Sequence, residues 1–370
     1  MALLAYVSGH GFGHWTRSEP VLERLAGRGI DVHVRTGGRA LPLARRAAWA
    51  RSVTEVDVGP GAIQRDPLQM DLPATRAALE AHLRGWSATV AREVELGRRL
   101  GARLVYADVP PLGLEVAATL GVPGVALANF TWSWIYAAWG ARDPFFAAAA
   151  ERMAEAEALA HDAIRLPGGG GLETLGRARG LAQDEPELAI RRPPTCTRQA
   201  ARARLLGPQG ERDPRPLVLL SFGGYGHLLD LSAHAAALPQ YRFVAFAAPQ
   251  GPRPENLLVL PHEHDLAHQD LVLAADALLA KPGYGTVSEC LTRPTPMVYV
   301  IPEGEFVEHP RLAAMVERWL PCQALAREEV LAGRWAPALE AALRARPREQ
   351  PPGNGLDEAV ARLAAWWERA

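Results

Sequence analysis

The feature that most constrains the fold is a unit that recurs in both halves of the chain. It consists of a short apolar run, a glycine-rich turn and then a helical pattern. The first unit joins Leu3–Ser8 to Gly9-His-Gly-Phe-Gly-His14, the second follows Leu217–Phe222, and the third follows Ala277–Ala280. A strand that enters a helix through a tight turn is the building block of a parallel sheet covered by helices on both faces. The sequence therefore predicts an α/β protein with two Rossmann-like, doubly wound parallel sheets.

The length supports two domains, because 370 residues exceed one ordinary domain and fit two. A Pro- and Arg-rich stretch over 182–216 separates the two series of strands, and Pro347–Gly355 is a second linker. We expect an N-terminal domain over 1–192 and a C-terminal domain over 193–346. A final helix within 356–370 is expected to pack back on the N-terminal domain.

Hydrophobic periodicity places further elements between the turns. The further strands are expected at Ile30–Arg35, Val53–Val58, Leu104–Ala107, Val122–Ala128, Phe243–Phe246, Leu257–Leu260 and Met297–Ile301. The helices are expected at Glu19–Leu25, Thr75–Leu100, Glu115–Leu120, Phe145–His161, Asp270–Ala274, Thr286–Thr292 and Leu356–Glu368.

Composition excludes several classes of protein. A formal charge of −1 gives no electrostatic case for binding nucleic acid. The three cysteines lie far apart and form no CxxC pair, which favours a reducing cytoplasm. No apolar run approaches the roughly 20 residues of a membrane span, and Met1–Gly9 is typical of a strand rather than a signal peptide. Composition leaves the oligomeric state open.

Lysine usage is extreme. Lys and Arg total 40, and Lys281 is the only lysine, so the other 39 are arginines. A single lysine marks either a place that needs a compact ammonium rather than a guanidinium, or a chance survivor of Lys-to-Arg drift. Because Ala280 precedes Lys281, no P-loop is possible.

The three turns suit an anion. None completes GxGxxG, since the sixth positions are His14, Leu229 and Ser288, so a dinucleotide dehydrogenase is disfavoured. Glycine lets backbone N–H groups approach a phosphate closely. In the third turn, Thr286 and Glu289 have the spacing of a capping box. Alternatively, Glu289 accepts hydrogen bonds from ribose hydroxyls. Spacing alone favours the cap.

Candidate acid–base residues follow two strands of the first sheet. His14 is a candidate general base, because the pKa of histidine lies near neutral pH, and His10 competes for that role. Asp108 ends a neighbouring strand and either orients His14 or forms a turn before Pro110. Both strand ends would face the cleft between the domains.

Other polar and aromatic segments have simpler interpretations. His262-Glu-His-Asp265, with His268, lacks a recognised ligand spacing, so we expect a loop beside the nucleotide and no metal. Glu303–His309 is either a sugar-binding or a solvated acidic loop. The arginines of 39–51 favour a solvated helix face over a membrane-surface patch. The aromatic run of 132–139 favours core packing over sugar stacking.

Two motifs together resemble a known fold family. Lys281-Pro-Gly-Tyr-Gly-Thr-Val-Ser-Glu289, followed by Pro294-Thr-Pro296, resembles the donor-binding signature of GT-B glycosyltransferases of the family 28 and UDP-glycosyltransferase types. The loop of residues 9–14 resembles their N-terminal glycine loop. Tyr106-Ala-Asp108 and Asn129-Phe-Thr-Trp-Ser-Trp-Ile-Tyr136 are similar to the glycosyltransferase-like N-terminal region of L-arabinokinases. We expect the similarity to extend to about residue 315, and the resemblance does not imply the kinase activity of arabinokinases.

The resemblance implies an inverting, metal-independent transfer from a nucleoside diphosphate sugar, UDP-linked, to an acceptor hydroxyl, with no other cofactor. The alternatives are a UDP-sugar epimerase and a module that binds a nucleotide sugar without reacting. His14 becomes the base and Asp108 its partner. The donor contacts become Gly11, Gly13, Gly223, Gly224, His264, Lys281, Gly283, Tyr284, Gly285, Thr286, Glu289 and Glu308.

Overall fold

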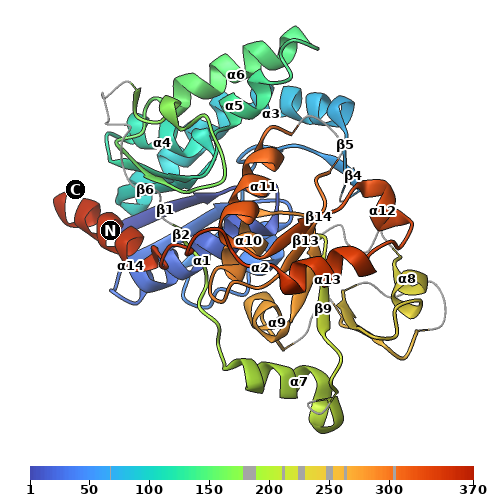
Figure 1. The fold of residues 1–370 in the computed structure, drawn as a ribbon. Coiled ribbons are helices and arrows are strands. Elements are labelled where there is room, and N and C mark those ends of the chain that lie inside the picture. The colour runs from blue at the N-terminus through green and yellow to red at the C-terminus, as the bar shows by residue number, and fades with distance from the viewer. Residues whose placement is uncertain are drawn as a thin grey trace.

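The computed structural model describes residues 1–66, 68–177, 189–210, 213–223, 230–246, 253–261, 265–302 and 306–370. In these ranges the chain forms two six-stranded sheets and one short antiparallel pair. Figure 1 shows the N-terminal half (blue to green) and the C-terminal half (yellow to red) built around separate sheets. The predicted two-domain, doubly wound α/β fold is therefore confirmed.

The N-terminal sheet has the strand order β3-β2-β1-β6-β7-β8, with every neighbouring pair parallel. Its strands are β1 (Ala2–Val7), β2 (Asp31–Thr36), β3 (Ser52–Glu55), β6 (Ala102–Asp108), β7 (Gly124–Ala128) and β8 (Asp162–Arg165). The edge strand β8 was not predicted, and the helix expected to reach His161 ends at Glu157. Only two of the four residues of β8 are apolar, so the pattern gives little strand signal.

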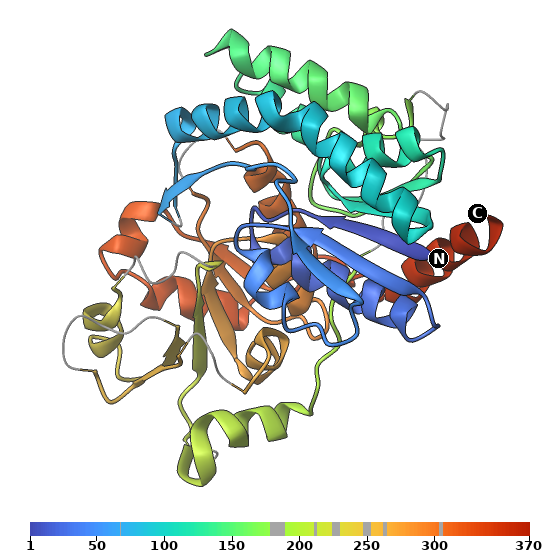
Figure 2. The same cartoon turned by 180° about the vertical axis from the view of Figure 1, so that it is seen from behind.

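Helices cover both faces of this sheet because its strands are buried on both sides. Along β1, Leu3, Ala5 and Val7 pack into one apolar cluster, while Leu4 and Tyr6 pack into another. Figure 2 shows α3, α4 and α6 over one side of the sheet. The helices of this half are α1 (Phe12–Ala26), α2 (Ala40–Ala44), α3 (Leu72–Leu100), α4 (Pro111–Leu120), α5 (Trp132–Ala137) and α6 (Pro144–Glu157), with a 3-10 turn at Leu172–Thr174.

The C-terminal sheet repeats the same topology, with the order β11-β10-β9-β12-β13-β14 and parallel pairing throughout. Its strands are β9 (Leu217–Ser221), β10 (Arg242–Ala245), β11 (Leu257–Val259), β12 (Ala277–Ala280), β13 (Met297–Tyr299) and β14 (Cys322–Ala324). The short edge strand β14 was not predicted. Its three residues, Cys-Gln-Ala, have no β-branched or aromatic side chain.

Seven helices within the described residues surround the second sheet. They are α7 (Arg198–Gly210), α8 (Ser232–Ala236), α9 (His268–Ala274), α10 (Tyr284–Cys290), α11 (Glu308–Trp319), α12 (Arg327–Leu331) and α13 (Ala336–Arg344). Helix α7 lies inside the stretch predicted to be a linker, so that prediction was wrong for its central part. Ala201 and Leu205 of α7 are buried against the core, which explains why this segment is ordered as a helix.

The two domains share one apolar cluster. It contains Leu3 and Val21 from the N-terminal half together with Leu219, Val287 and other residues of the C-terminal half. Helix α1 packs against α10 within this shared core. Side chains that leave water across a domain boundary stabilise one relative placement of the domains.

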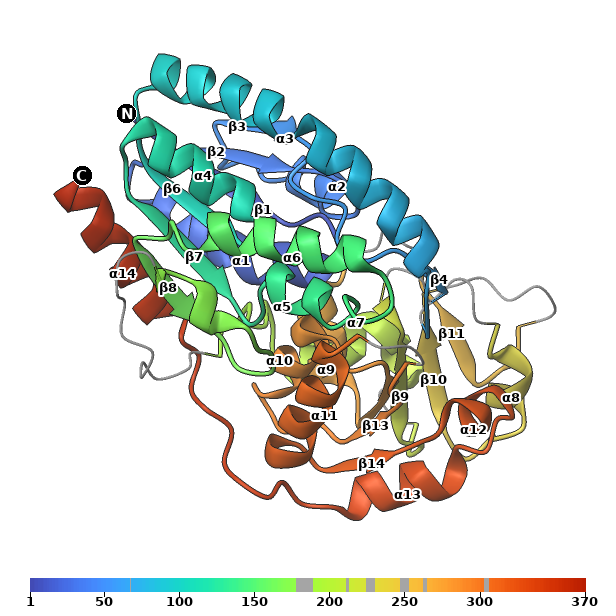
Figure 3. The same ribbon diagram turned by 90° about the horizontal axis from the view of Figure 1, so that it is seen from above.

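Two apolar side chains also cross the boundary in opposite directions. The hairpin of β4 (Gln64–Asp66) and β5 (Gln69–Met70) extends from the N-terminal domain, and Leu68 is buried in the core of the C-terminal domain. In return, Phe306 from the C-terminal domain is buried in a core of the N-terminal domain. Figure 3 shows β4 beside the strands of the second sheet.

The last helix, α14 (Leu356–Arg369), packs on α1 and β6 of the N-terminal domain. Asp162 at the start of β8 receives hydrogen bonds from Arg362 and, at 2.6 Å, from Trp366 Nε1. The N- and C-terminal ends consequently lie on the same side of the molecule (Figure 1). The sequence placed this helix correctly along the chain, and the structure adds the residues that hold it.

Two segments singled out in the sequence serve the core. Trp132, Tyr136 and Trp139 belong to or follow α5 and are buried, as the core-packing interpretation expects. Trp49, close in sequence to the arginines that flank α2, stacks on Trp15 with ring centroids 6.2 Å apart. Among the described residues, no helix combines the length and the apolar character that crossing a bilayer requires.

Candidate active site

Both sheets reverse their strand order at one position, between β1 and β6 in the first and between β9 and β12 in the second. Ligands of open α/β sheets bind outside the carboxyl ends of the strands at such switch points. His14 follows β1 and Asp108 ends β6, while Ser221 ends β9 and Lys281 follows β12. The candidate residues of each domain therefore lie at its switch point.

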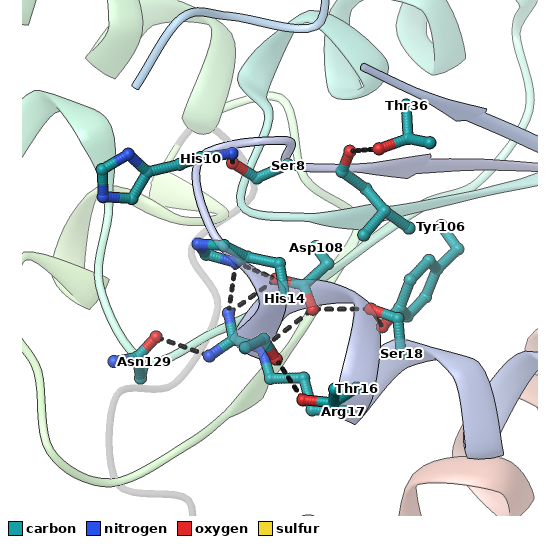
Figure 4. A network of polar contacts seen from close by, with 12 residues as sticks. Ser8, His10, His14, Thr16, Arg17, Ser18, Thr36, Tyr106, Asp108 and Asn129 are labelled. Carbon is teal, nitrogen blue, oxygen red and sulfur yellow. Dashed lines mark hydrogen bonds and ion pairs between the residues drawn. The ribbon is translucent and has the colours of Figure 1, made fainter. Parts of the chain in front are cut away.

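His14 and Asp108, which are 94 residues apart in sequence, are in contact. His14 Nδ1 lies 2.9 Å from Asp108 Oδ1, and both side chains are buried. Figure 4 shows one ring nitrogen of His14 facing Asp108 while the other points out of the network. A carboxylate at Nδ1 favours the tautomer with a proton there, which leaves Nε2 free to accept one.

Sequence reasoning missed two further members of this network. Arg17 donates through Nε and Nη2 to the two oxygens of Asp108, at 2.8 and 2.6 Å, and Ser18 Oγ donates to Oδ2 at 2.6 Å. His14, Arg17 and Ser18 are spaced i, i+3 and i+4 on α1, so they share one helix face. That spacing, on a helix that otherwise buries Trp15, Val21 and Leu22, was the available signal.

The residue after Asp108 is strained. Val109 has a φ of +74°, a left-handed conformation that a β-branched residue rarely adopts, and it is the only non-glycine residue with a positive φ among those described. Its N–H donates to Leu127 O at 3.2 Å, and Pro110 follows. Strain of this kind persists where surrounding structure imposes it, and it commonly accompanies functional sites. Here it fixes how β6 ends at Asp108.

Burial and neighbouring charges set the protonation of the pair. Burial raises the pKa of Asp108, but the charge and hydrogen bonds of Arg17 outweigh it, so the net pKa lies below the ordinary value. Burial and then the charge of Arg17 lower the pKa of His14, against the opposing effect of Asp108. The pair is therefore an ionised carboxylate beside a neutral imidazole at neutral pH.

His10, the competing base, is differently placed. Its Nδ1 accepts a hydrogen bond from Ala62 N at 3.2 Å, so its proton resides on Nε2. Burial, followed by the nearby His14, Lys281 and Arg39, lowers the pKa of His10 to about 3. Its ring packs against Trp132 and Phe306. This geometry favours His14 over His10 as a proton acceptor.

The first and third glycine turns meet at the domain boundary. A Cβ built on Gly13 would lie 3.5 Å from Gly285 N, and one on Gly285 would lie 3.3 Å from Gly13 Cα. Gly11 is the N-cap of α1, and Gly283 is the N-cap of α10. The structure thus brings together turns that are about 270 residues apart in sequence.

The second turn is described only in part. Gly223 follows β9 with a φ of +66°, which favours glycine. Gly224 lies outside the described residues, as do His262, Glu263 and His264 of the proposed nucleotide loop. No cluster of three metal-binding side chains occurs within the ranges that the structure covers.

The predicted capping box at Thr286 and Glu289 is wrong. Helix α10 begins at Tyr284, three residues earlier than the box requires, so Gly283 is the N-cap and no side chain caps it. Thr286 is half-buried within the helix, and the carboxylate of Glu289 contacts His268 rather than the start of the helix.

Glu289 instead ends a partly buried chain of polar side chains. Its Oε2 lies 2.5 Å from His268 Nδ1, and His268 Nε2 lies 3.1 Å from Ser221 Oγ at the end of β9. Burial lowers the pKa of His268, but the carboxylate of Glu289 outweighs it, so the net pKa is raised. This charge pair holds Glu289 at the C-terminal switch point, and sequence spacing gave no sign of it.

Two more candidates reach across the boundary. Lys281 Nζ donates to Gln64 Oε1 of the β4 strand at 3.3 Å, and burial lowers its pKa to about 8. Glu308 is the first residue of α11, so the acidic segment is helical and buried from this point on. Glu308 accepts a hydrogen bond from Asn129 Nδ2 at 2.7 Å, and burial raises its pKa to about 7.

Tyr284 has a different place from the other residues of its motif. Its hydroxyl accepts a hydrogen bond from Ile190 N at 3.2 Å, and its ring lies under the Arg17 guanidinium, 4.9 Å from ring centroid to Cζ. Tyr284 therefore faces the buried network of the N-terminal domain. Such a cation–π contact is stronger when the cation is desolvated.

Known proteins resemble this chain both in sequence and in structure. No protein-family model matches the chain. The L-arabinokinase of Arabidopsis thaliana is 31% identical over 353 residues, which cover 95% of this chain and 33% of the plant protein. The chain thus spans about a third of the length of this curated relative.

Solved structures match over the whole chain. The calicheamicin glycosyltransferase CalG4 has a TM-score of 0.61 at 17% identity, covering 100% of this chain and 94% of that one. VinC, a glycosyltransferase in complex with dTDP, has a TM-score of 0.59 at 16% identity, covering 100% of both chains. Acinetobacter baumannii MurG has a TM-score of 0.56 at 16% identity, again covering 100% of both. The chain has the GT-B fold of these glycosyltransferases, and its sequence is similar to one third of an L-arabinokinase.

Proposed function

We propose that the chain is a glycosyltransferase that moves a sugar from a nucleoside diphosphate sugar to an acceptor hydroxyl, with inversion and without a metal. The observation that carries the proposal is the meeting of two parts. The buried His14–Asp108 pair lies beside the Gly13–Gly285 contact, where the donor motif of the C-terminal domain begins. The shared fold adds support, because two of the similar structures contain a thymidine diphosphate.

In the proposed reaction, His14 Nε2 accepts the proton of the acceptor hydroxyl while that oxygen attacks the anomeric carbon. A new C–O bond forms, the bond from the anomeric carbon to the diphosphate oxygen breaks, and its electron pair leaves with the nucleoside diphosphate. One nucleophile displacing one leaving group from the opposite face inverts the anomeric carbon. Asp108 keeps the His14 proton on Nδ1 and stabilises the imidazolium that forms.

The C-terminal domain would bind the donor. Backbone N–H groups of the turn around Gly283 and Gly285, together with the Lys281 ammonium, would stabilise the charge on the departing diphosphate. Oε2 of Glu289 contacts His268. Its other carboxylate oxygen, Oε1, would accept a hydrogen bond from a ribose hydroxyl. Glu308 would contact the sugar. The three cysteines form no disulfide with one another, which fits a reducing compartment. We therefore place this activity in the cytoplasm.

The test has two stages. Thermal shift with UDP, dTDP, ADP and GDP, and with their sugars, should show one nucleoside diphosphate raising the unfolding temperature. That nucleotide's sugars are then incubated with a panel of acceptor alcohols, and released nucleoside diphosphate is measured. Isomerised sugar in the absence of acceptor would identify an epimerase instead. Binding without release for any acceptor would identify a non-catalytic module, and no stabilisation by any nucleotide would refute all three.

A further inference from the structure

Arg17 is the most completely engaged buried cation of the network. Its side chain is 2% exposed, and its guanidinium is held on three sides. Nε and Nη2 donate to Asp108, Nη1 donates to Asn129 Oδ1 at 2.8 Å, and one face covers the Tyr284 ring. Three of its five N–H groups donate in these contacts, and its burial keeps the guanidinium away from a substrate, so any role in turnover is exerted through its neighbours.

The contact that matters most is with His14. Arg17 Nη2 lies 3.1 Å from His14 Nδ1, and it also donates to the same Asp108 oxygen that His14 Nδ1 faces at 2.9 Å. A proton on His14 Nδ1 satisfies Asp108, whereas a bare Nδ1 would accept from Arg17. Two tautomers therefore compete, and the position of Arg17 relative to Asp108 decides between them. The 2.9 Å contact with an anionic oxygen favours the Nδ1 proton.

Arg17 also compensates the charge of Asp108. Without it, an uncompensated buried carboxylate would stand beside His14 and favour the imidazolium, which cannot accept a proton. With it, the ion pair is close to neutral overall, and the imidazole stays unprotonated. The acid limb of any reaction that needs a neutral His14 then depends on Arg17.

Tyr284 couples the position of Arg17 to the C-terminal domain. It belongs to α10 of the C-terminal domain, whereas His14, Arg17 and Asp108 belong to the N-terminal one. Asn129, the third partner of Arg17, in turn donates to Glu308 of α11. Two of the contacts around Arg17, the Tyr284 ring directly and Glu308 through Asn129, thus exist only when the two domains are docked as in this structure.

We propose that Arg17 is a positioning residue that holds Asp108 so that His14 keeps its proton on Nδ1 and presents a bare Nε2, and that Tyr284 makes this state depend on domain docking. The proposal rests on the proposed function for the use made of Nε2. The state of the His14 ring can be measured without any substrate, so the two claims fail separately.

The groups that face His14 come from several elements. Asp108 of β6 and Arg17 of α1 are in contact with its ring nitrogen, and His10 of the preceding loop lies 6.4 Å away between ring centroids. Glu308 of α11 and Tyr284 of α10 act through Arg17. Of these groups, only Arg17 and Asp108 bear directly on the charge of the imidazole.

The direct test is nitrogen-15 NMR of histidine-labelled protein over pH 5 to 9, with the His14 signals assigned by His14→Asn. Wild type should show a neutral ring with Nδ1 protonated at pH 7. Arg17→Gln should move the His14 titration to higher pH, so that the ring is charged at pH 7. The matched control is Arg24→Gln, since Arg24 lies on the same helix but pairs at the surface with Asp357. An unchanged His14 titration in Arg17→Gln would overturn the proposal.

Further variants separate charge from geometry. Arg17→Lys should keep the titration near that of wild type yet lower turnover about tenfold or more, because an ammonium cannot hold both oxygens of Asp108. In Arg17→Gln, the turnover lost at pH 7 should partly return at higher pH. Arg24→Gln should retain both the wild-type pH profile and turnover, and equal losses in both glutamine variants would refute a specific role for Arg17.

A double variant and two tyrosine variants complete the test. If Arg17→Gln does not fold, the double variant Arg17→Gln/Asp108→Asn removes both buried charges together. In it, His14 should show Nε2 protonated in a substantial share of molecules, and an unchanged Nδ1 tautomer would overturn the proposal. Tyr284→Leu, compared with Tyr284→Phe, should move the His14 titration toward that of Arg17→Gln. If both tyrosine variants titrate like wild type, the link to domain docking is wrong.

Discussion

Gly13 and Gly285 face each other across the domain boundary, so closely that a Cβ built on Gly285 would lie 3.3 Å from Gly13 Cα. Each belongs to the first turn of the helix that follows its strand, α1 in one domain and α10 in the other. The close approach of two backbones is a reason for glycine at both positions, yet the room for a methyl group differs between them.

This difference gives the first prediction. The Cβ of Gly285→Ala would lie 3.2 Å from Thr16 Oγ1 and 3.3 Å from Gly13 Cα, so the domains must separate slightly. The Cβ of Gly13→Ala would have its nearest neighbour at 3.5 Å, an ordinary contact, and alanine favours a helix by about 1 kcal/mol over glycine. We expect Gly285→Ala to lower the unfolding temperature and nucleotide affinity. Gly13→Ala should leave the unfolding temperature equal or higher; the reverse order would contradict the observed contact.

His14→Ala should lower turnover by about 10²- to 10⁴-fold, the usual contribution of a general base. Nucleotide affinity should stay near that of wild type, because His14 belongs to the other domain. His10→Asn is the companion variant, since an amide oxygen can accept from Ala62 N as His10 Nδ1 does. Turnover by His14→Ala equal to that of wild type, measured as released nucleoside diphosphate, would remove His14 from the mechanism.

Lys281 should be the only lysine side chain that an amine reagent labels, because no other lysine exists; the α-amino group of Met1 reacts as well, and its adduct is counted separately. Its pKa of about 8 leaves much of the amine neutral at pH 8, so trinitrobenzenesulfonate should react there faster than with an ordinary lysine. A bound nucleoside diphosphate should slow the reaction, and mass spectrometry would locate the adduct. Lys281→Arg is the control for labelling, while Lys281→Met should weaken nucleotide binding about tenfold. Labelling that is unaffected by saturating nucleotide would place Lys281 outside the donor site.

The His268–Glu289 pair should stabilise the fold in a pH-dependent way. The folded pKa of His268 is raised above the ordinary 6.5, so its contribution is complete below about pH 6.5 and is lost as the pH rises through the raised value. Glu289→Gln should therefore reduce the free energy of unfolding most at pH 5.5 to 6.5 and least at pH 9. Urea unfolding of both proteins across this range tests it, with Ser221→Ala as the control that keeps the charge pair. A difference that is constant with pH would show that the pair is not ionised.

Docking of α14 should depend on Asp162. Asp162→Asn weakens the hydrogen bonds from Arg362 and Trp366, and we expect the free energy of unfolding to fall by about 1–3 kcal/mol. Asp357→Asn removes a carboxylate from the same helix, but its partner Arg24 is exposed, so the unfolding midpoint should barely change. Equal effects in urea unfolding would show that Asp162 does not anchor the helix.

The sequence alone determined most of the architecture. Runs such as Leu3–Ser8 and Ala277–Ala280 are apolar at every position or nearly so, and this local pattern is enough to indicate strands buried on both faces. The glycine turns placed His14 and Lys281 at strand ends, the apolar run of 104–107 placed Asp108 at another, and the structure has all three there. The edge strands β8 and β14 were not predicted, because an edge strand needs few apolar residues and therefore shows little hydrophobic pattern in the sequence.

What only the tertiary structure decided is the set of partners. Arg17 and Ser18 precede the helix expected at Glu19–Leu25, and nothing in the sequence links them to the carboxylate of Asp108, some 90 residues away, which the structure places beside them. Glu289 had the spacing of a cap, and its real partner, His268, comes from another helix. Hydrophobic periodicity is a local property that any short window reveals. The pairing of buried charges depends on which strand ends the folded sheets bring together, so it is decided only when the two domains have formed and docked.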